Sequence, residues 1–174
     1  MNDIMLDIEA LGTKNYSVII QVGMVYFDRY TGELGEELSV NISIQDSLDH
    51  GLKVDGATLR WWFEQENRSW LKSPVNLGKA LQMIRDFAHK NKKALVWAHA
   101  TFDFPLLDCA YEVLGQRLPF PYCNLRDIRT LVDLSKRPYK KNKDGDPKDH
   151  DGLSDCKYQI QYCVECFNLL KKEI

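Results

Sequence analysis

The sequence contains no long hydrophobic run and no excess of basic charge. No apolar run approaches the ~20 residues that a membrane-spanning helix requires. The first residues, Met1-Asn2-Asp3-Ile4, lack the basic and then apolar pattern of a signal peptide. We therefore expect a cytoplasmic protein with no membrane partner. The formal charge is −2, which disfavours a protein that coats nucleic acid through an overall basic field.

Cysteine occurs without a clear disulfide or zinc pattern. The odd number of cysteines, 5 in all, favours free thiols. Cys163 and Cys166 have the C-x-x-C spacing but fall in a predicted helix, and no second such pair accompanies them. Together with Cys156 they occupy roughly one helical face. We expect burial as small apolar residues; a zinc site or a redox pair is the alternative.

Length and composition indicate one globular domain. The 174 residues are 44% hydrophobic and 28% charged, typical of a chain that forms a core. There is little room for a second domain. We predict a single domain over residues 1–174.

The hydrophobic pattern predicts an α/β fold. Residues 4–8, 17–28 and 37–44 are predicted strands with short connections, which favours an antiparallel meander. Residues 94–98 form a further predicted strand. Helices are predicted over residues 55–66, 76–91, 104–114, 125–134 and 153–171. A meander followed by parallel units predicts a mixed sheet with helices packed on it, as in the ribonuclease H-like fold.

One segment has no apolar period. Residues 136–149 contain several lysines, two prolines and a glycine, so we predict a loop. It is either an ordinary solvated loop or a basic flap that touches phosphates beside a site.

Acidic residues at three places could carry metal chemistry. Asp7 and Glu9 alternate along a predicted core strand, so both carboxylates point to one face. Two such anions repel unless a cation lies between them, and hard divalent cations prefer oxygen ligands. Asp103 follows the predicted strand over residues 94–98 and is either a helix cap or a third ligand. His150 precedes Asp155 by five residues at the start of the last predicted helix.

These motifs, in this order, resemble the DnaQ-like 3′→5′ exonucleases of the DEDD type with a motif histidine. The segments LDIEALGT, SVIIQVGMVYFD, TGELG, TLRWW and CNLRDIRTL look like the exonuclease VIII-type branch of phages and bacteria. The resemblance extends from residue 4 to about residue 166. The one departure is Gly152, where many relatives carry alanine. The resemblance implies a five-stranded ribonuclease H-like sheet, antiparallel at the meander and parallel elsewhere.

The resemblance also implies a mechanism. Asp7, Glu9, Asp103 and Asp155 would hold two Mg²⁺ or Mn²⁺ ions that clamp the scissile phosphate. His150 would be the general base that accepts the proton of the attacking water, for which its reference pKa is suitable. The product would be a nucleoside 5′-monophosphate.

Several further residues are predicted to contact substrate. His99 either contacts substrate or is a buried, hydrogen-bonded residue. Trp61, Trp62 and Phe102 are candidates to stack on bases, which every base allows. Of the two adjacent tryptophans we expect Trp62 to face substrate, although core packing is its alternative. Leu11 resembles the residue that wedges near the terminal base. We interpret Asp127 as the cap of a helix, not as a further ligand.

The partner would be a single-stranded DNA or RNA 3′ end, and the protein a monomer or homodimer. Two alternatives remain from the sequence. One is an oligoribonuclease-like enzyme that acts on very short oligonucleotides. The other is a non-catalytic nucleic-acid-binding module on the same fold, which predicts that at least one of the five motif residues is missing; all five are present.

Overall fold

The computed structural model describes residues 1–137 and 150–172. Their centre is a five-stranded sheet in the order β3-β2-β1-β4-β5. The strands are β1 (Asp3–Ala10), β2 (Ile19–Phe27), β3 (Leu34–Asn41), β4 (Leu95–Ala98) and β5 (Leu125–Asp127). β1, β2 and β3 pair antiparallel, whereas β4 runs parallel to both β1 and β5. The predicted mixed sheet of the ribonuclease H-like fold is therefore confirmed.

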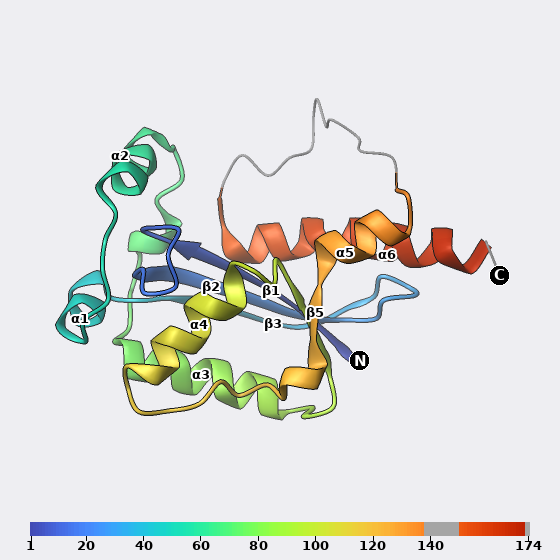
Figure 1. Ribbon diagram of the computed structural model, residues 1–174, viewed down its shortest axis with the longest axis horizontal. Coiled ribbons are helices and arrows are strands. Elements are labelled where there is room, and N and C mark those ends of the chain that lie inside the picture. The colour runs from blue at the N-terminus through green and yellow to red at the C-terminus, as the bar shows by residue number, and fades with distance from the viewer. Residues whose placement is uncertain (138–149, 173–174) are drawn as a thin grey trace.

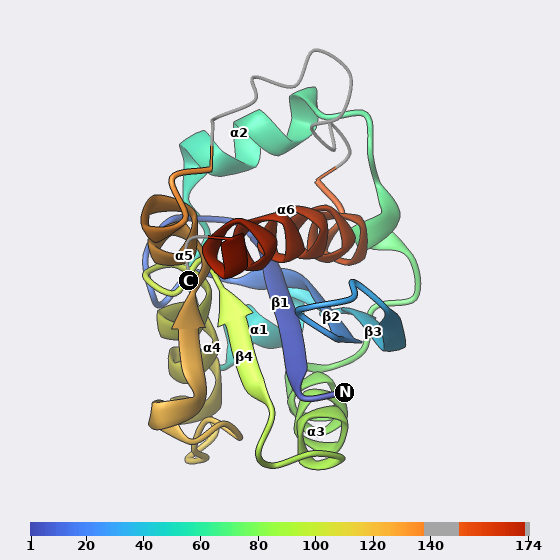
Figure 2. The ribbon, with the colours of Figure 1, turned by 90° about the vertical axis from the view of Figure 1, so that its right-hand side faces the viewer.

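Helices cover both faces of the sheet. One face carries α6 (Gly152–Lys172) and α5 (Ile128–Leu134), and the other carries α3 (Leu77–His89) and α4 (Asp103–Glu112), as Figures 1 and 2 show. Two helices, α1 (Ile44–Asp49) and α2 (Gly56–Glu64), and the short helix η1 (Ser69–Leu71) lie between β3 and α3 in the chain. A second short helix, η2 (Tyr122–Asn124), precedes β5. No helix in the described ranges is both long and apolar enough to span a membrane.

The alternation of β1 divides the core into two layers. Ile4, Leu6 and Ile8 pack into the larger hydrophobic cluster, while Met5 packs into the cluster beneath α5 and α6. Successive side chains of a strand point to opposite faces. Asp7 and Glu9 therefore project toward α6, on the same side as Met5.

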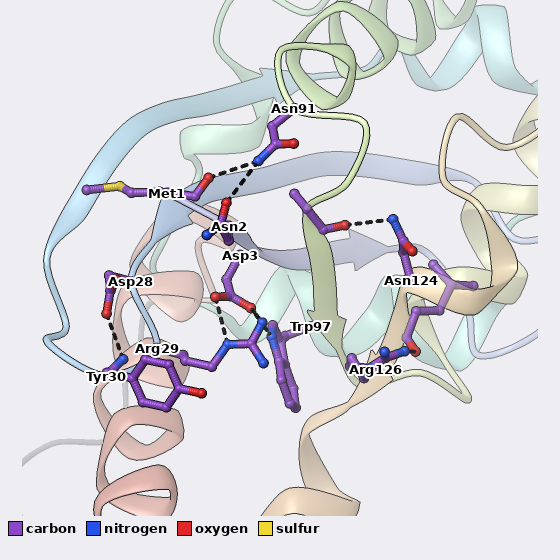
Figure 3. A network of polar contacts seen from close by, with 12 residues as sticks. Met1, Asn2, Asp3, Asp28, Arg29, Tyr30, Asn91, Trp97, Asn124 and Arg126 are labelled. Atoms are coloured by element: carbon purple, nitrogen blue, oxygen red, sulfur yellow. Dashed lines mark hydrogen bonds and ion pairs between the residues drawn. The ribbon is translucent and has the colours of Figure 1, made fainter.

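The beginning of β1 carries a third acid on this face. Asp3 is 2% exposed, and its carboxylate accepts a hydrogen bond of 2.8 Å from Nε of Arg29 and another of 2.8 Å from the indole nitrogen of Trp97. The guanidinium of Arg29 also lies over the rings of Trp97 and Phe167. Figure 3 shows Asp3 between Arg29 and Trp97. This buried acid is thus neutralised by a cation of the protein itself.

The predicted elements agree with the structure except in two places. Residues 125–134 were predicted as one helix, but Leu125–Asp127 is the edge strand β5 and only Ile128–Leu134 is helical. The correction has a local cause: the side chain of Asp127 caps α5 by accepting hydrogen bonds from the backbone N–H groups of Arg129 and Thr130, so the helix cannot start earlier. The predicted capping role of Asp127 is confirmed. Helix α1 was not predicted at all.

The five cysteines are free thiols, and Cys156, Cys163 and Cys166 are buried as predicted. Most of the predicted basic loop, residues 138–149, lies outside the described residues.

Two glycines let α6 approach the sheet. A Cβ at Gly23 would lie 2.2 Å from the carbonyl carbon of Gly152. A Cβ at Gly152 would lie 2.9 Å from the backbone nitrogen of Gly23 and 3.2 Å from the carbonyl oxygen of Asp7. The start of α6 therefore rests directly on β2 beside Asp7.

We expect Gly23→Ala to lower the free energy of unfolding by about 1–3 kcal/mol or more, as overpacking of a core does. Gly78→Ala is the matched control, because a Cβ there meets its nearest atom at 3.8 Å in ordinary contact and alanine favours a helix by roughly 1 kcal/mol. Urea denaturation of both variants measures the difference. Equal stability of the two variants would contradict this packing.

Candidate active site

Four carboxylates gather where β1 meets the first turns of two helices. Asp7 and Glu9 project from β1, Asp103 is the first residue of α4, and Asp155 lies in the first turn of α6. Asp7, Glu9 and Asp103 are 8%, 9% and 1% exposed, and Asp155 is half-buried. The structure therefore brings together all four acids that the sequence analysis selected, although 148 positions separate the first from the last.

The acids form two groups, and each group includes a histidine. Ligand atoms of Asp7, His99 and Asp103 lie within 4.8 Å of one another. The same holds for Glu9, His150 and Asp155. Carboxylate oxygens and imidazole nitrogens are common ligands of divalent metals.

Burial and mutual repulsion raise the pKa values of Asp7, Glu9 and Asp103 in the absence of a cation. Burial, followed by the charge of Asp155, raises the pKa of Asp7 to about 7. Burial and the charge of Asp7 raise the pKa of Glu9 to about 9, and a hydrogen bond between the carboxyls of Glu9 and Asp155 contributes. The pKa of Asp103 is also raised well above its ordinary value, first by burial and then by Asp7.

These observations fit a divalent metal centre. Asp7, Glu9 and Asp103 are buried together, and within the described ranges no lysine or arginine forms an ion pair with these three. A cation among them would remove the repulsion that raises the pKa values. The donor set contains carboxylates and histidines but no cysteine, which disfavours a soft-metal site.

The ring of His150 packs against an aromatic cluster beside Glu9 and Asp155. Its centroid lies 4.6 Å from that of Trp61 and 6.0 Å from that of Trp62, edge to face in both cases. His150 is half-buried and has a backbone φ of +41°, in the left-handed region. His150 thus stands in a left-handed conformation two residues before α6 begins at Gly152.

The residues after His150 are held by a polar clamp formed by Gln21, Ser69 and Asp151. The carboxylate of Asp151 accepts hydrogen bonds from Ser69 Oγ at 2.9 Å and Gln21 Nε2 at 3.3 Å. It also accepts one from the backbone nitrogen of Ser154 at 3.1 Å, within the first turn of α6. Gln21 Oε1 in turn accepts from Gly152 N at 2.8 Å. The clamp joins β2 and η1 to the start of α6.

His99 and Phe102 lie at the other side of the acids, in the connection between β4 and α4. The backbone nitrogen of His99 donates to the carboxylate of Asp103 at 2.8 Å. Burial, with a smaller effect of the charge of Arg129, lowers the pKa of His99. Phe102 is half-buried and precedes Asp103 as the N-cap residue of α4, without a side-chain cap. Asp103 is therefore not the helix cap that was its alternative role.

A cavity of about 410 Å³ opens beside Glu9. Its walls include Ala10, Thr13, Trp61 and Phe102, from β1, the loop after it, α2 and the start of α4. It is mainly apolar and lies next to the acids, so it can accept a flat ring.

Two of the predicted substrate contacts have little free surface. Leu11 is 0% exposed, and Trp62 is 2% exposed with its indole nitrogen bonded to the carbonyl oxygen of Ala10 at 2.9 Å. Trp62 is among the residues that line the cavity, but its low exposure leaves little ring surface for a base, so its stacking role stays a prediction. Its neighbour Trp61 is 39% exposed and lines the cavity. Leu59, three residues before Trp62, was the available signal for the buried face of α2. Either tryptophan is nevertheless compatible with the apolar pattern of this helix.

Sequence analysis did not single out Gln159. This residue is 4% exposed, and its amide nitrogen donates to Asp7 at 2.6 Å. It lies one helical turn after Asp155, so the i, i+4 spacing places both side chains on the same face of α6. The i, i+4 spacing from Asp155 was the signal in the sequence that could have identified Gln159.

A mixed five-stranded sheet with four clustered acids and adjacent histidines defines the class: the chain has the ribonuclease H-like fold of DnaQ-like 3′→5′ exonucleases. Residues 2–167 match the family model of the 3′-5′ exoribonuclease Rv2179c-like domain. The chain belongs to this family. The narrower resemblance to the exonuclease VIII-type branch stays a prediction.

Solved structures with a similar fold include Escherichia coli exonuclease I in complex with a dT13 oligonucleotide. The identity is 12%, the TM-score 0.72, and the match covers 97% of this chain and 41% of that one. The zinc-bound form of the exonuclease I–ssDNA complex matches with 12% identity and a TM-score of 0.70, over 99% of this chain and 43% of that one. This chain thus spans about two fifths of exonuclease I.

A 3′-exonuclease that recognises the histone mRNA stem-loop matches with 13% identity and a TM-score of 0.60, over 96% of this chain and 82% of that one. At such identities these likenesses show the fold. No curated protein sequence gives a significant match.

The raised pKa values predict that the metal-free protein loses stability as the pH rises. Asp7 and Glu9 have ordinary pKa values of 3.8 and 4.5 but about 7 and about 9 in the folded protein. The folded state therefore binds more protons, and its advantage is complete below about pH 4 and lost as the pH rises through 7 and 9. In EDTA we expect Tm at pH 9 to lie about 5 °C or more below that at pH 6.

Differential scanning calorimetry measures this, with Mg²⁺ added in a parallel series. Mg²⁺ should raise Tm more at pH 8 than at pH 6, because protons compete with the ion for the carboxylates. A metal-free Tm that does not change between pH 6 and 9 would show that these acids are already ionised.

Proposed function

We propose that this chain is a metal-dependent 3′→5′ exonuclease that removes nucleoside 5′-monophosphates from single-stranded RNA ends. The observation that supports it most is that four carboxylates and two histidines gather in two groups, in which Asp7, Glu9 and Asp103 are buried. RNA is favoured over DNA by the exoribonuclease description of the family, and exonuclease I structures with DNA make single-stranded DNA the alternative.

We further propose that residues 1–174 form one domain that acts in the cytoplasm, as a monomer or homodimer. The family match over residues 2–167 supports one domain, and five free thiols are typical of a reducing compartment.

The two groups of acids would hold two Mg²⁺ or Mn²⁺ ions, one at Asp7 and Asp103 and one at Glu9 and Asp155. When bound, such ions lower the pKa of the attacking water and stabilise the departing 3′ oxygen. Gln159 restrains Asp7 through its amide, and the backbone nitrogen of His99 restrains Asp103. These contacts fix the carboxylates before substrate arrives, which is the condition for precise placement of reacting groups.

His150 would accept the proton of the attacking water at a ring nitrogen. It is half-buried beside Glu9 and Asp155, so its ring reaches both the acids and solvent. Trp61 packs against the ring, and the polar clamp at Asp151 fixes the chain that follows it. An anionic neighbour favours the protonated imidazole, which assists proton acceptance.

The terminal base would enter the cavity beside Glu9. Trp61 and Phe102 offer the aromatic surface there, and the cavity of about 410 Å³ suits a single base and its sugar. Stacking on aromatic rings is independent of base identity. This arrangement accounts for removal of one nucleotide at a time without sequence preference.

The direct test uses 5′-labelled single-stranded RNA and DNA with Mg²⁺, Mn²⁺ or EDTA. We expect a metal-dependent ladder that shortens from the 3′ end, faster on RNA. His150→Ala should reduce kcat by about 10²–10⁴-fold, the usual contribution of a general base, while the rise of Tm with Mg²⁺ persists. His50→Ala is the control, because His50 caps α1, outside both groups of acids. Wild-type turnover in His150→Ala would remove this residue from the mechanism.

Trp61→Ala should raise KM for oligonucleotides by roughly 5- to 100-fold, since stacking contributes ~1–3 kcal/mol per base. Phe63→Ala is the matched control: Phe63 lies on the same helix, is 70% exposed, and does not line the cavity. Steady-state kinetics on a trinucleotide compare the two variants. An equal effect of both substitutions would refute a specific role of Trp61.

A further inference from the structure

Arg129 places a positive charge at the edge of the active site. β5 ends beside β4, with Asp127 paired to Ala98, so the residues that follow both strands lie at the same edge of the sheet. Nη1 of Arg129 donates a hydrogen bond of 3.3 Å to Oγ1 of Thr101. Thr101 lies between His99 and Asp103, so this bond connects the guanidinium to the loop that borders the acids.

The guanidinium keeps most of its donors available. Arg129 is exposed, and in the two described ranges it forms no ion pair with a carboxylate. The nearest acid in the sequence, Asp127, uses its carboxylate to cap α5. An arginine has five N–H donors, and the bond to Thr101 engages one of them.

The position relative to the cavity indicates which phosphate it can reach. The cavity beside Glu9 would hold the 3′-terminal nucleotide, and Arg129 is not among the residues that line it. It lies instead behind Thr101, to which it is hydrogen-bonded. If the scissile phosphate lies at the acids and the terminal nucleotide in the cavity, a strand that leaves past Thr101 brings its next phosphate to Arg129.

We propose that the guanidinium of Arg129 binds the backbone phosphate immediately 5′ of the scissile phosphate. Arginine is suited to this, because its planar fork matches the oxygens of a phosphate. It also supplies the local cation that a chain with a net charge of −2 needs to hold a polyanion. The inference rests on the proposed function, and it makes a second phosphate part of substrate recognition.

Dinucleotides test the proposal, because NpN contains the scissile phosphate alone whereas pNpN adds the 5′ one. We expect the wild-type protein to hydrolyse pNpN with a kcat/KM about tenfold or more above that for NpN, the factor for one hydrogen bond to a charged group. Arg129→Gln should lower kcat/KM for pNpN by about tenfold or more relative to that for NpN, so that the preference disappears. On a longer RNA, it should reduce the slope of log Kd against log salt, measured with Ca²⁺ in place of Mg²⁺, by about 0.7.

Two control variants separate binding from a structural role. Arg126→Gln changes a neighbouring arginine whose guanidinium bonds to the carbonyl oxygens of Cys123 and Leu125, and it should keep the preference. Thr101→Val removes the acceptor of the Arg129 hydrogen bond but keeps the charge, and it should also keep the preference.

An equal loss on NpN and pNpN in Arg129→Gln would mean that Arg129 supports the loop only, and would overturn the proposal. So would a wild-type protein that hydrolyses both dinucleotides equally well. A wild-type protein that hydrolyses neither dinucleotide nor any longer RNA or DNA overturns the proposed function together with this inference.

Discussion

The approach of α6 to the sheet is the constraint on which the site depends. The backbones of Gly23 and Gly152 meet so closely that neither position has room for a side chain. This contact lies opposite Asp7, because Asp7 and Gly23 are paired across β1 and β2. It therefore sets how far Asp155 and His150 lie from the acids of β1. The buried cysteines of α6, packed beneath the same strands, stabilise the helix in this position.

Burying an acid costs free energy. Arg29 offsets this cost at Asp3, whereas no ion pair among the described residues does so at Asp7 and Glu9. Asp3 lies on the same face as Asp7 and Glu9, and it is paired with Arg29 and Trp97. Asp7 instead receives an uncharged amide, and Glu9 shares a hydrogen bond with another acid. Among the described residues, one strand thus carries a buried acid with a cationic partner and buried acids without an ion pair. The surroundings of Asp7 fit a cation from solution, as we propose.

The sequence predicted the parts of the fold and site that local patterns determine. Alternation placed Asp7 and Glu9 on one face, and the five motif residues of the resemblance converge in space. The prediction of a helix at Leu125–Asp127, which form the edge strand β5, was wrong. Three residues joined directly to a helix are too few to show a period of their own. The sequence did not show that Trp62 is the more buried of the two adjacent tryptophans, because helical phase decides this, and both line the cavity. Arg129 and the clamp at Asp151 arise from contacts between distant segments, which no local pattern shows.

The two histidines of the site have different surroundings, and this difference supports the different roles that we propose for them. His99 is mostly enclosed, and burial together with the charge of Arg129 lowers its pKa. It is therefore neutral near pH 7. A general base has to become an imidazolium, and the surroundings of His99 disfavour that form. His150 lies beside Glu9 and Asp155 and is in contact with solvent. We therefore keep His150 as the proposed base and His99 as a proposed positioning residue, and the charge of the nearby Arg129 is consistent with this assignment.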